Sequence, residues 1–318
     1  MKIVIPGGSG HLGHLLTGEL RRAGHDVVVL SRHLDGPGVK WDGRTLGPWA
    51  GEIDGADAVI NLAGRNVNCR YSARHRDEIL RSRVDSTRVV GEAIARAACP
   101  PRVWLQMSTA TIYSHRFDAP NDERSGVIGG SEADAPTEWR FSIEVAKAWE
   151  KALDDAQTPD TRKVKLRTAV VMTSAPGGVF SLLQRHVRLG FGRFDDGRQY
   201  MSWIHQGDFV RAVQWLIAHD LVDGVVNVAA PNPLPNAEFM EVLREAMHRR
   251  LAIPSSGRVL RFGAWVMRTE PELLLKSRRV VPTRLLEQGF RFEFPEWDAA
   301  ARDLAGRVDA MPHAQPAY

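Results

Sequence analysis

The chain has 318 residues, of which 43% are hydrophobic, enough for one large domain or two smaller ones with a buried core. Its 42 basic and 38 acidic side chains are interleaved and leave a net charge of +4, so no basic run indicates a nucleic-acid partner. Two cysteines cannot form a disulfide framework, and no apolar run reaches the roughly 18 residues of a membrane span. With no signal peptide before the first apolar run, we expect a cytoplasmic protein with no membrane partner.

The first half of the sequence alternates short apolar runs with longer amphipathic stretches, which is typical of βαβ units. Strands are expected at residues 2–6, 27–30, 39–41, 58–61, 103–107 and 164–172, and helices at 12–23, 72–98 and 138–156. The stretch 114–137 is rich in Asp, Gly, Ser and Pro and is expected to form a long loop, of the kind that is often functional.

The second half is less regular. Helices are expected at residues 179–189, 208–219, 236–248 (with Asn236 as its cap) and 261–276, and short strands at 201–205 and 225–228. The sequence therefore predicts an α/β fold, a doubly wound parallel Rossmann sheet with a smaller, mainly helical C-terminal region. We expect the dinucleotide-binding domain to span residues 1–175, with 202–230 returning to it, and the substrate-side region to span 176–318.

The segment GGSGHLG, residues 7–13, follows the first strand and opens the first helix. It fits the spacings GxGxxG and GxxGxxG, in which glycines turn the chain sharply, admit a pyrophosphate and let the helix pack against the sheet. The phosphates would then bind the free N–H groups at the positive end of the helix. The residues expected to contact a dinucleotide here are Gly7, Ser9, Gly10, His11, Leu12 and Gly13.

The second strand ends in Leu30-Ser31-Arg32. An NAD site usually has an acid at this point to accept the ribose hydroxyls. An acid would repel a 2′-phosphate, whereas the Arg32 guanidinium can bind it in a bidentate manner and the Ser31 hydroxyl can donate to it. The sequence therefore predicts NADP as the cofactor, the alternative being that Arg32 is an ordinary surface arginine.

These motifs resemble those of the extended short-chain dehydrogenase/reductase superfamily. GGSGHLG resembles its cofactor loop, and similar segments are NLAG (61–64), STATIYS (108–114) and RTAVV (167–171). A narrower resemblance is to an epimerase-like subfamily that is misnamed after a cell-division inhibitor and has its own C-terminal extension. The segments that carry it are VINLAG (59–64), EILRSRVDSTR (78–88), GRQYMSWIH (197–205), APNPLPNAEF (230–239) and RVVPTRLLEQGFRF (279–292).

The resemblance implies further cofactor contacts. Leu62, Ala63 and Gly64 would line the adenosine side, and Val171 would lie near the nicotinamide. Glu78 and Arg83, on the helix that follows, would contact the cofactor or form an exposed ion pair of no functional importance.

The catalytic set of the superfamily is a Ser or Thr together with a Tyr and a Lys spaced YxxxK. Thr109 stands at the Ser/Thr position, but the helical segment WRFSIEVAKAWEKA (139–152) contains no tyrosine, and Ile143 precedes Lys147 by four residues. The candidate catalytic residues are Thr109, Tyr113 and Lys147. Tyr113 or water would be the replacement proton source, and Lys147 would be a ribose ligand.

Two functions remain open. The first is an NADP-dependent oxidoreductase or epimerase-like enzyme that transfers hydride to or from an unidentified small carbonyl or alcohol. The second is a non-catalytic NADP(H)-binding sensor or scaffold, which the missing tyrosine favours. The sequence shows no metal-ligand spacing, and it leaves a homodimer open.

Overall fold

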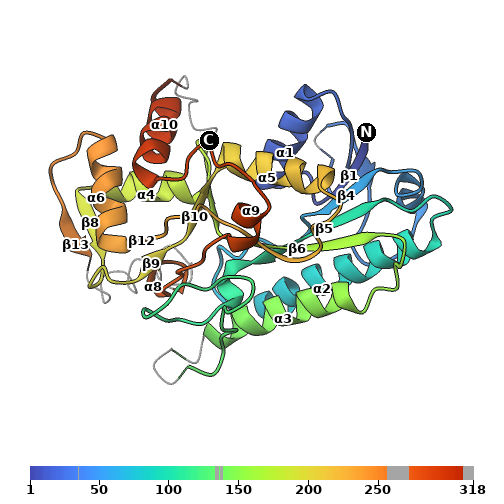
Figure 1. Ribbon diagram of the computed structural model, residues 1–318, viewed down its shortest axis with the longest axis horizontal. Coiled ribbons are helices and arrows are strands. Elements are labelled where there is room, and N and C mark those ends of the chain that lie inside the picture. Colours follow the sequence, from blue (N-terminus) through green and yellow to red (C-terminus); the bar gives the residue numbers. More distant parts are fainter. Residues whose placement is uncertain (35, 133–135, 137–138, 256–271, 311–318) are drawn as a thin grey trace.

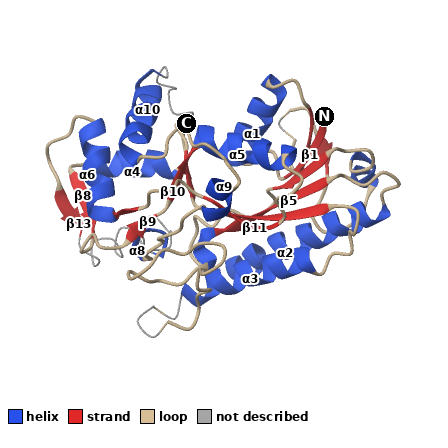
Figure 2. Cartoon of the chain, in the orientation of Figure 1, coloured by secondary structure: helices blue, strands red, loops and turns tan. Residues whose placement is uncertain are grey.

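The computed structural model describes residues 1–34, 36–132, 136, 139–255 and 272–310. Within these residues, seven parallel strands form the central sheet (Figures 1 and 2). In spatial order they are β11 (Gly224–Val228), β6 (Arg162–Thr168), β5 (Val103–Thr109), β4 (Ala58–Asn61), β1 (Lys2–Pro6), β2 (Asp26–Ser31) and β3 (Val39–Lys40). The predicted doubly wound parallel sheet is confirmed.

Helices cover both faces of this sheet (Figure 1). The helices α1 (His11–Arg22) and α5 (Gln206–Ala218) lie on one face, and α2 (Ala73–Arg96) and α3 (Arg140–Asp154) lie on the other. Alternate residues of β1 enter two different cores: Ile3 and Ile5 pack with residues of α1 and α5, whereas Val4 packs with residues of α2. Because both faces are buried, β1 from Ile3 onward and β2 over Val27–Leu30 are continuously apolar rather than alternating.

A smaller region with its own core lies beside the sheet and contains α4 (Val179–Arg188), α6 (Asn236–Ala246) and α10 (Trp297–Ala310). Its aromatic centre includes Trp297, whose ring stacks on Phe239 with 4.0 Å between centroids. The strand pairs outside the central sheet are β7 (Val170–Met172) with β10 (Trp203–His205), β9 (Tyr200–Met201) with β12 (Leu234–Pro235), and β8 (Phe191–Phe194) with β13 (Ile253–Ser255).

The short helices are η1 (Pro48–Glu52), η2 (Ala110–Ile112), α8 (Glu272–Leu275) and α9 (Thr283–Glu287). Across the described ranges, no helix is both long enough and apolar enough to cross a bilayer. The division of the chain at residue 175 stays a prediction.

The structure corrects several predicted elements. The single strand expected at 164–172 is divided at Ala169: the Ala169 N–H bonds to Val228 O in the central sheet, whereas β7 pairs with β10. The run 201–205 likewise divides into β9 and β10. Residues 261–271 of the helix expected at 261–276 lie outside the described residues.

Asn236 does not cap α6 as the sequence predicts, because the helix begins at that residue. Its side-chain Oδ1 instead accepts a hydrogen bond from the Phe194 N–H at 2.7 Å. The strands β8 and β13 were not predicted, since FGRF and IPS are too short and too irregular to show a strand period.

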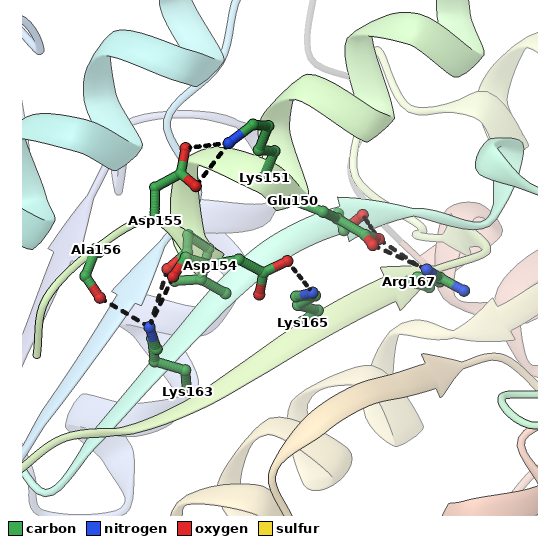
Figure 3. A network of polar contacts seen from close by, with 10 residues as sticks. Glu150, Lys151, Asp154, Asp155, Ala156, Lys163, Lys165 and Arg167 are labelled. Carbon is green, nitrogen blue, oxygen red and sulfur yellow. Dashed lines mark hydrogen bonds and ion pairs between the residues drawn. The ribbon is translucent and has the colours of Figure 1, made fainter. Parts of the chain in front are cut away.

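A buried ion pair fastens α3 to the sheet (Figure 3). Glu150 accepts from Arg167 Nε at 2.9 Å and from Arg167 Nη2 at 2.8 Å, and it also accepts from the Ser108 hydroxyl at 2.7 Å. The two charged side chains are only 11% and 8% exposed. Burial alone would raise the pKa of Glu150, but the hydrogen bonds and charge of Arg167, together with the Ser108 hydroxyl, hold it below its usual value. The pair therefore holds together α3, β5 and β6.

Replacing Glu150 by Ala would leave the Arg167 guanidinium buried without its counter-charge. We expect Glu150→Ala to lower the free energy of unfolding by about 3–5 kcal/mol. The matched control is Asp155→Ala, which removes the partner of Lys151 at the exposed end of the same helix and is expected to cost less than about 1 kcal/mol. Denaturant titrations of the two variants measure the difference, and equal losses would contradict the role given to the buried pair.

Candidate functional site

The strand order changes direction beside β1, because β2 follows on one side and β4 on the other. In open α/β sheets, ligands bind just beyond the carboxyl ends of the strands at this switch point. A cleft of about 180 Å³ lies there. Its lining residues are Gly7, Ser9, Gly10, Ser31, Arg32, Trp41, Asp42, Gly43, Arg44, Leu62, Ala63, Gly64, Ser82 and Ser86.

The glycine loop packs directly against the chain that leaves β4. Gly7 has a φ of +79°, and a Cβ placed on it would lie 2.7 Å from the backbone of Ala63. Gly10 differs, since a Cβ there would meet only the Gly7 carbonyl oxygen, at 3.4 Å. Gly10 is also the N-cap of α1 and supplies no side-chain hydrogen bond. The first N–H groups of α1 therefore have no side-chain cap, and the backbone at Gly10 is not crowded by neighbouring atoms. These two features suit the binding of a pyrophosphate.

Hydroxyl and guanidinium donors gather where β2 ends. Ser31, which is 4% exposed, has its Oγ 2.6 Å from Ser9 Oγ in the glycine loop, and its hydroxyl donates to the His33 carbonyl oxygen at 2.5 Å. Arg32 is exposed and lines the same cleft. The strand ends without an acid, and the Arg32 guanidinium that follows it suits a phosphate rather than a free ribose.

Six of the lining residues were not predicted from the sequence. Trp41, Asp42, Gly43 and Arg44 come from the end of the third strand region, and they reach the cleft because β3 pairs with β2. Ser82 and Ser86 are four apart on α2 and so share one face of that helix. The four-residue spacing of Ser82 and Ser86 is a signal that the sequence contains. The position of residues 41–44 at the cleft, by contrast, depends on the order of the strands in the sheet.

Several predicted cofactor residues do not line this cleft. In the structure His11 Nε2 lies 2.6 Å from Thr173 Oγ1, Leu12 packs against the core, and Val171 is buried in β7. Gly13 has a packing role, because a Cβ on it would lie 2.4 Å from the Gly8 carbonyl oxygen. Their contact with a cofactor stays a prediction.

Glu78 and Arg83 are both engaged within the protein. Glu78 pairs with Arg65 and accepts from Arg74 Nε at 2.8 Å. The Arg83 guanidinium lies over the Trp149 ring at 5.0 Å, and it donates to the Arg65 carbonyl oxygen at 3.1 Å. Burial lowers the pKa of Arg83 to about 10. Both side chains therefore fix the loop that follows β4, and their cofactor contact also stays a prediction.

The three candidate catalytic residues have different surroundings. Thr109 ends β5, is partly exposed, and its side chain accepts from the Thr111 N–H at 3.1 Å. Lys147 is exposed and donates to the Gly129 carbonyl oxygen at 3.1 Å. Ile143, one helical turn before Lys147, is 2% exposed and cannot donate a proton.

Tyr113 lies in the protein interior. It is 2% exposed, and its hydroxyl donates to Asn227 Oδ1 at 2.9 Å, with Asp122 O at 3.1 Å. Burial raises the pKa of Tyr113, which makes the phenol a poorer acid. This geometry opposes the sequence-based interpretation of Tyr113 as the replacement proton donor. In the part of the chain that the structure describes, no three His, Cys, Asp or Glu side chains are grouped to hold a metal ion.

The chain matches known protein families and curated relatives along most of its length. The NAD dependent epimerase/dehydratase family matches residues 3–229, and a domain of unknown function, DUF1731, matches 258–304, where a C-terminal extension is expected. Epimerase family protein SDR39U1 of Homo sapiens is 32% identical over 313 residues, which cover 96% of this chain and 99% of that protein. Epimerase family protein YfhF of Bacillus subtilis is 29% identical over 310 residues, which cover 96% and 98%.

Solved structures show the same fold. The crystal structure of human SDR39U1 (isoform 2) with NADPH superimposes with a TM-score of 0.84 at 31% identity, covering 96% of this chain and 99% of that chain. The nucleoside-diphosphate sugar epimerase of Corynebacterium glutamicum gives a TM-score of 0.76 at 28% identity, covering 96% of this chain and 58% of that chain.

The close packing at Gly13 gives a prediction with a matched control in the same helix. We expect Gly13→Ala to destabilise the protein by about 1–3 kcal/mol, because the added methyl group meets the Gly8 backbone. Gly18→Ala should be neutral or stabilising by up to about 1 kcal/mol, because a Cβ there meets only Arg22 Nη2 at 3.6 Å. Thermal and denaturant unfolding measure both, and a harmless Gly13→Ala would contradict the packing argument.

Proposed function

Because the chain belongs to the NAD dependent epimerase/dehydratase family, we propose that it binds NADP(H) in the cleft beside β1, β2 and β4 and transfers hydride to or from a small carbonyl or alcohol. The observation that carries the proposal is the end of β2, where Ser31 and Arg32 line the cleft with Ser9. The NADPH in the crystal structure of human SDR39U1 supports this choice of cofactor.

In this proposal, the cleft receives the adenosine and phosphate portions of the cofactor. Its volume of about 180 Å³ is below the roughly 300–1,000 Å³ of a typical ligand pocket, as expected for part of a dinucleotide. The uncapped start of α1 would bind the pyrophosphate, and Ser31 and Arg32 would bind the 2′-phosphate. Leu62, Ala63 and Gly64 would face the adenosine through a loop that is held by the bond from the Ala63 N–H to Asn61 Oδ1, at 3.1 Å.

Reduced NADP, when bound, supplies the hydride. Thr109 would orient the reacting oxygen, because this partly exposed residue stands at the carboxyl end of β5. Water is the proposed proton source, since Tyr113 is buried and Ile143 is apolar. Lys147 would bond the nicotinamide ribose after it releases the Gly129 carbonyl oxygen.

The alternative function is a non-catalytic NADP(H)-binding sensor or scaffold. The observation that favours it is the absence of a phenol on α3, where Ile143 precedes Lys147 by one turn. The same cleft would then bind the cofactor without turnover.

Titration with NADPH and NADH tests the choice of cofactor. Wild-type protein should bind NADPH more tightly than NADH. Arg32→Asp should weaken NADPH binding more than about tenfold, because attraction to the 2′-phosphate becomes repulsion, while NADH binding should not weaken. Arg249→Asp makes the same charge change at an exposed site in the other region and should alter neither affinity. A preference for NADH in the wild-type protein would refute the proposal.

Consumption of NADPH across a panel of small carbonyl compounds tests the enzymatic part. With a compound that is reduced, Thr109→Ala should lower kcat about 100-fold, the usual effect of removing one hydrogen-bond donor to the reacting oxygen. Thr109→Ser keeps the hydroxyl and should keep most of the activity. Full activity in Thr109→Ala would remove Thr109 from the catalytic set, and NADPH binding without any turnover would favour the sensor or scaffold.

A further inference from the structure

Arg44 is a second arginine at the cleft, and the proposal above gives it no role. It lies in the loop after β3 and lines the cleft together with Arg32, Ser9 and Ser31. These four residues come from the glycine loop, the end of β2 and the loop after β3. They therefore contribute two guanidinium groups and two hydroxyl groups to the lining of the cleft.

The backbone that carries Arg44 is fixed on both sides. Asp42 Oδ1 accepts from the N–H groups of Arg44 at 2.8 Å and Thr45 at 2.9 Å, and the Arg44 carbonyl oxygen accepts from Arg88 Nη2 at 2.8 Å. The loop is tied to the end of β2 because the Trp41 N–H donates to Ser31 O at 3.1 Å. The Arg44 side chain thus starts from a fixed backbone, three residues after the contact between Trp41 and Ser31.

The Arg44 side chain itself is held only weakly. It is 59% exposed, and among the described residues its one ion pair is with Asp85, at 3.8 Å from Nε to Oδ2. An exposed ion pair at this distance contributes little to the stability of the protein. The guanidinium can therefore leave the carboxylate for an anion of higher charge with little loss of free energy. Asp85 is on α2, one residue before the cleft-lining Ser86.

A phosphate monoester carries a charge of about −1.5 to −2 at neutral pH, which one arginine does not balance. The hydroxyl groups of Ser9 and Ser31 bring no charge, and the Ser31 hydroxyl already donates to the His33 carbonyl oxygen at 2.5 Å. We propose that Arg44 is the second arginine of a 2′-phosphate clamp, and that Asp85 holds it when the phosphate is absent. This inference rests on the proposed NADP(H) site, and it makes cofactor discrimination depend on the loop after β3 as well as on Arg32.

Another geometry would place Arg44 on the face of the adenine ring. The two geometries differ in what they recognise, because adenine is common to NADPH and NADH, whereas the 2′-phosphate is present only in NADPH. Comparing the two cofactors therefore separates them without any measurement of turnover.

The test is fluorescence titration of the full-length protein with NADPH and with NADH. Arg44→Gln should weaken NADPH binding roughly tenfold, the loss of one charge-assisted contact, and should change NADH binding less than about twofold. Asp85→Asn should tighten NADPH binding and leave NADH binding unchanged, because it frees Arg44. Arg81→Gln is the matched control: this exposed arginine on α2 pairs with Asp77 and does not line the cleft.

The double variant Arg32→Gln/Arg44→Gln adds a check on the shared ligand. Two arginines that bind one phosphate are coupled, so the combined loss for NADPH should differ from the product of the single losses. Unchanged NADPH binding in Arg44→Gln, or an equal loss for NADPH and NADH, would overturn the clamp while Arg32→Asp still supports the proposed function. A wild-type protein that does not bind NADPH would overturn both.

Discussion

The buried ion pair between Glu150 and Arg167 is the interaction on which the half of the sheet that carries Thr109 depends. The pair contacts β5 through Ser108, and Arg167 itself belongs to β6. The Arg167 guanidinium also lies 5.0 Å from the centroid of the Tyr113 ring. Tyr113 in turn bonds Asn227 of β11. Polar groups as deeply buried as these are tolerated only when they are paired. The result is a rigid edge of three adjacent strands, at which Thr109 ends β5.

The cleft beside β1 depends on close packing of the backbone rather than on an ion pair. Gly7 packs against the backbone of Ala63, and Gly13 packs against the backbone of Gly8. Neither contact leaves room for a side chain, so the position of α1 is set by van der Waals packing rather than by charge. The charged residues that line the cleft, Arg32, Asp42 and Arg44, are all exposed. The glycine loop is thus fixed by its packing, whereas the exposed charged side chains can adjust to a ligand.

The features of the site that could be predicted from the sequence lie within short, continuous segments of the chain. GGSGHLG carries its own signal, because the strand, the glycines and the helix are consecutive, and Ser31-Arg32 simply ends the next strand. The features that were not predicted depend on residues far apart in the chain. Arg44 reaches the cleft only because β3 pairs with β2, and Tyr113 is buried by Asn227, 114 residues further on. No short-range pattern distinguishes a buried phenol from one that faces a substrate.

The contact between His11 and Thr173 has a consequence for the way in which ligands communicate. His11 is in the first turn of α1, and Thr173 follows β7, so this 2.6 Å contact spans 162 residues of sequence and joins the glycine loop to the segment that leads into α4. A ligand that displaces Thr173 would also break this contact with the first turn of α1. Such coupling is reciprocal: whatever free energy one ligand adds to or removes from the binding of the other is returned in equal measure.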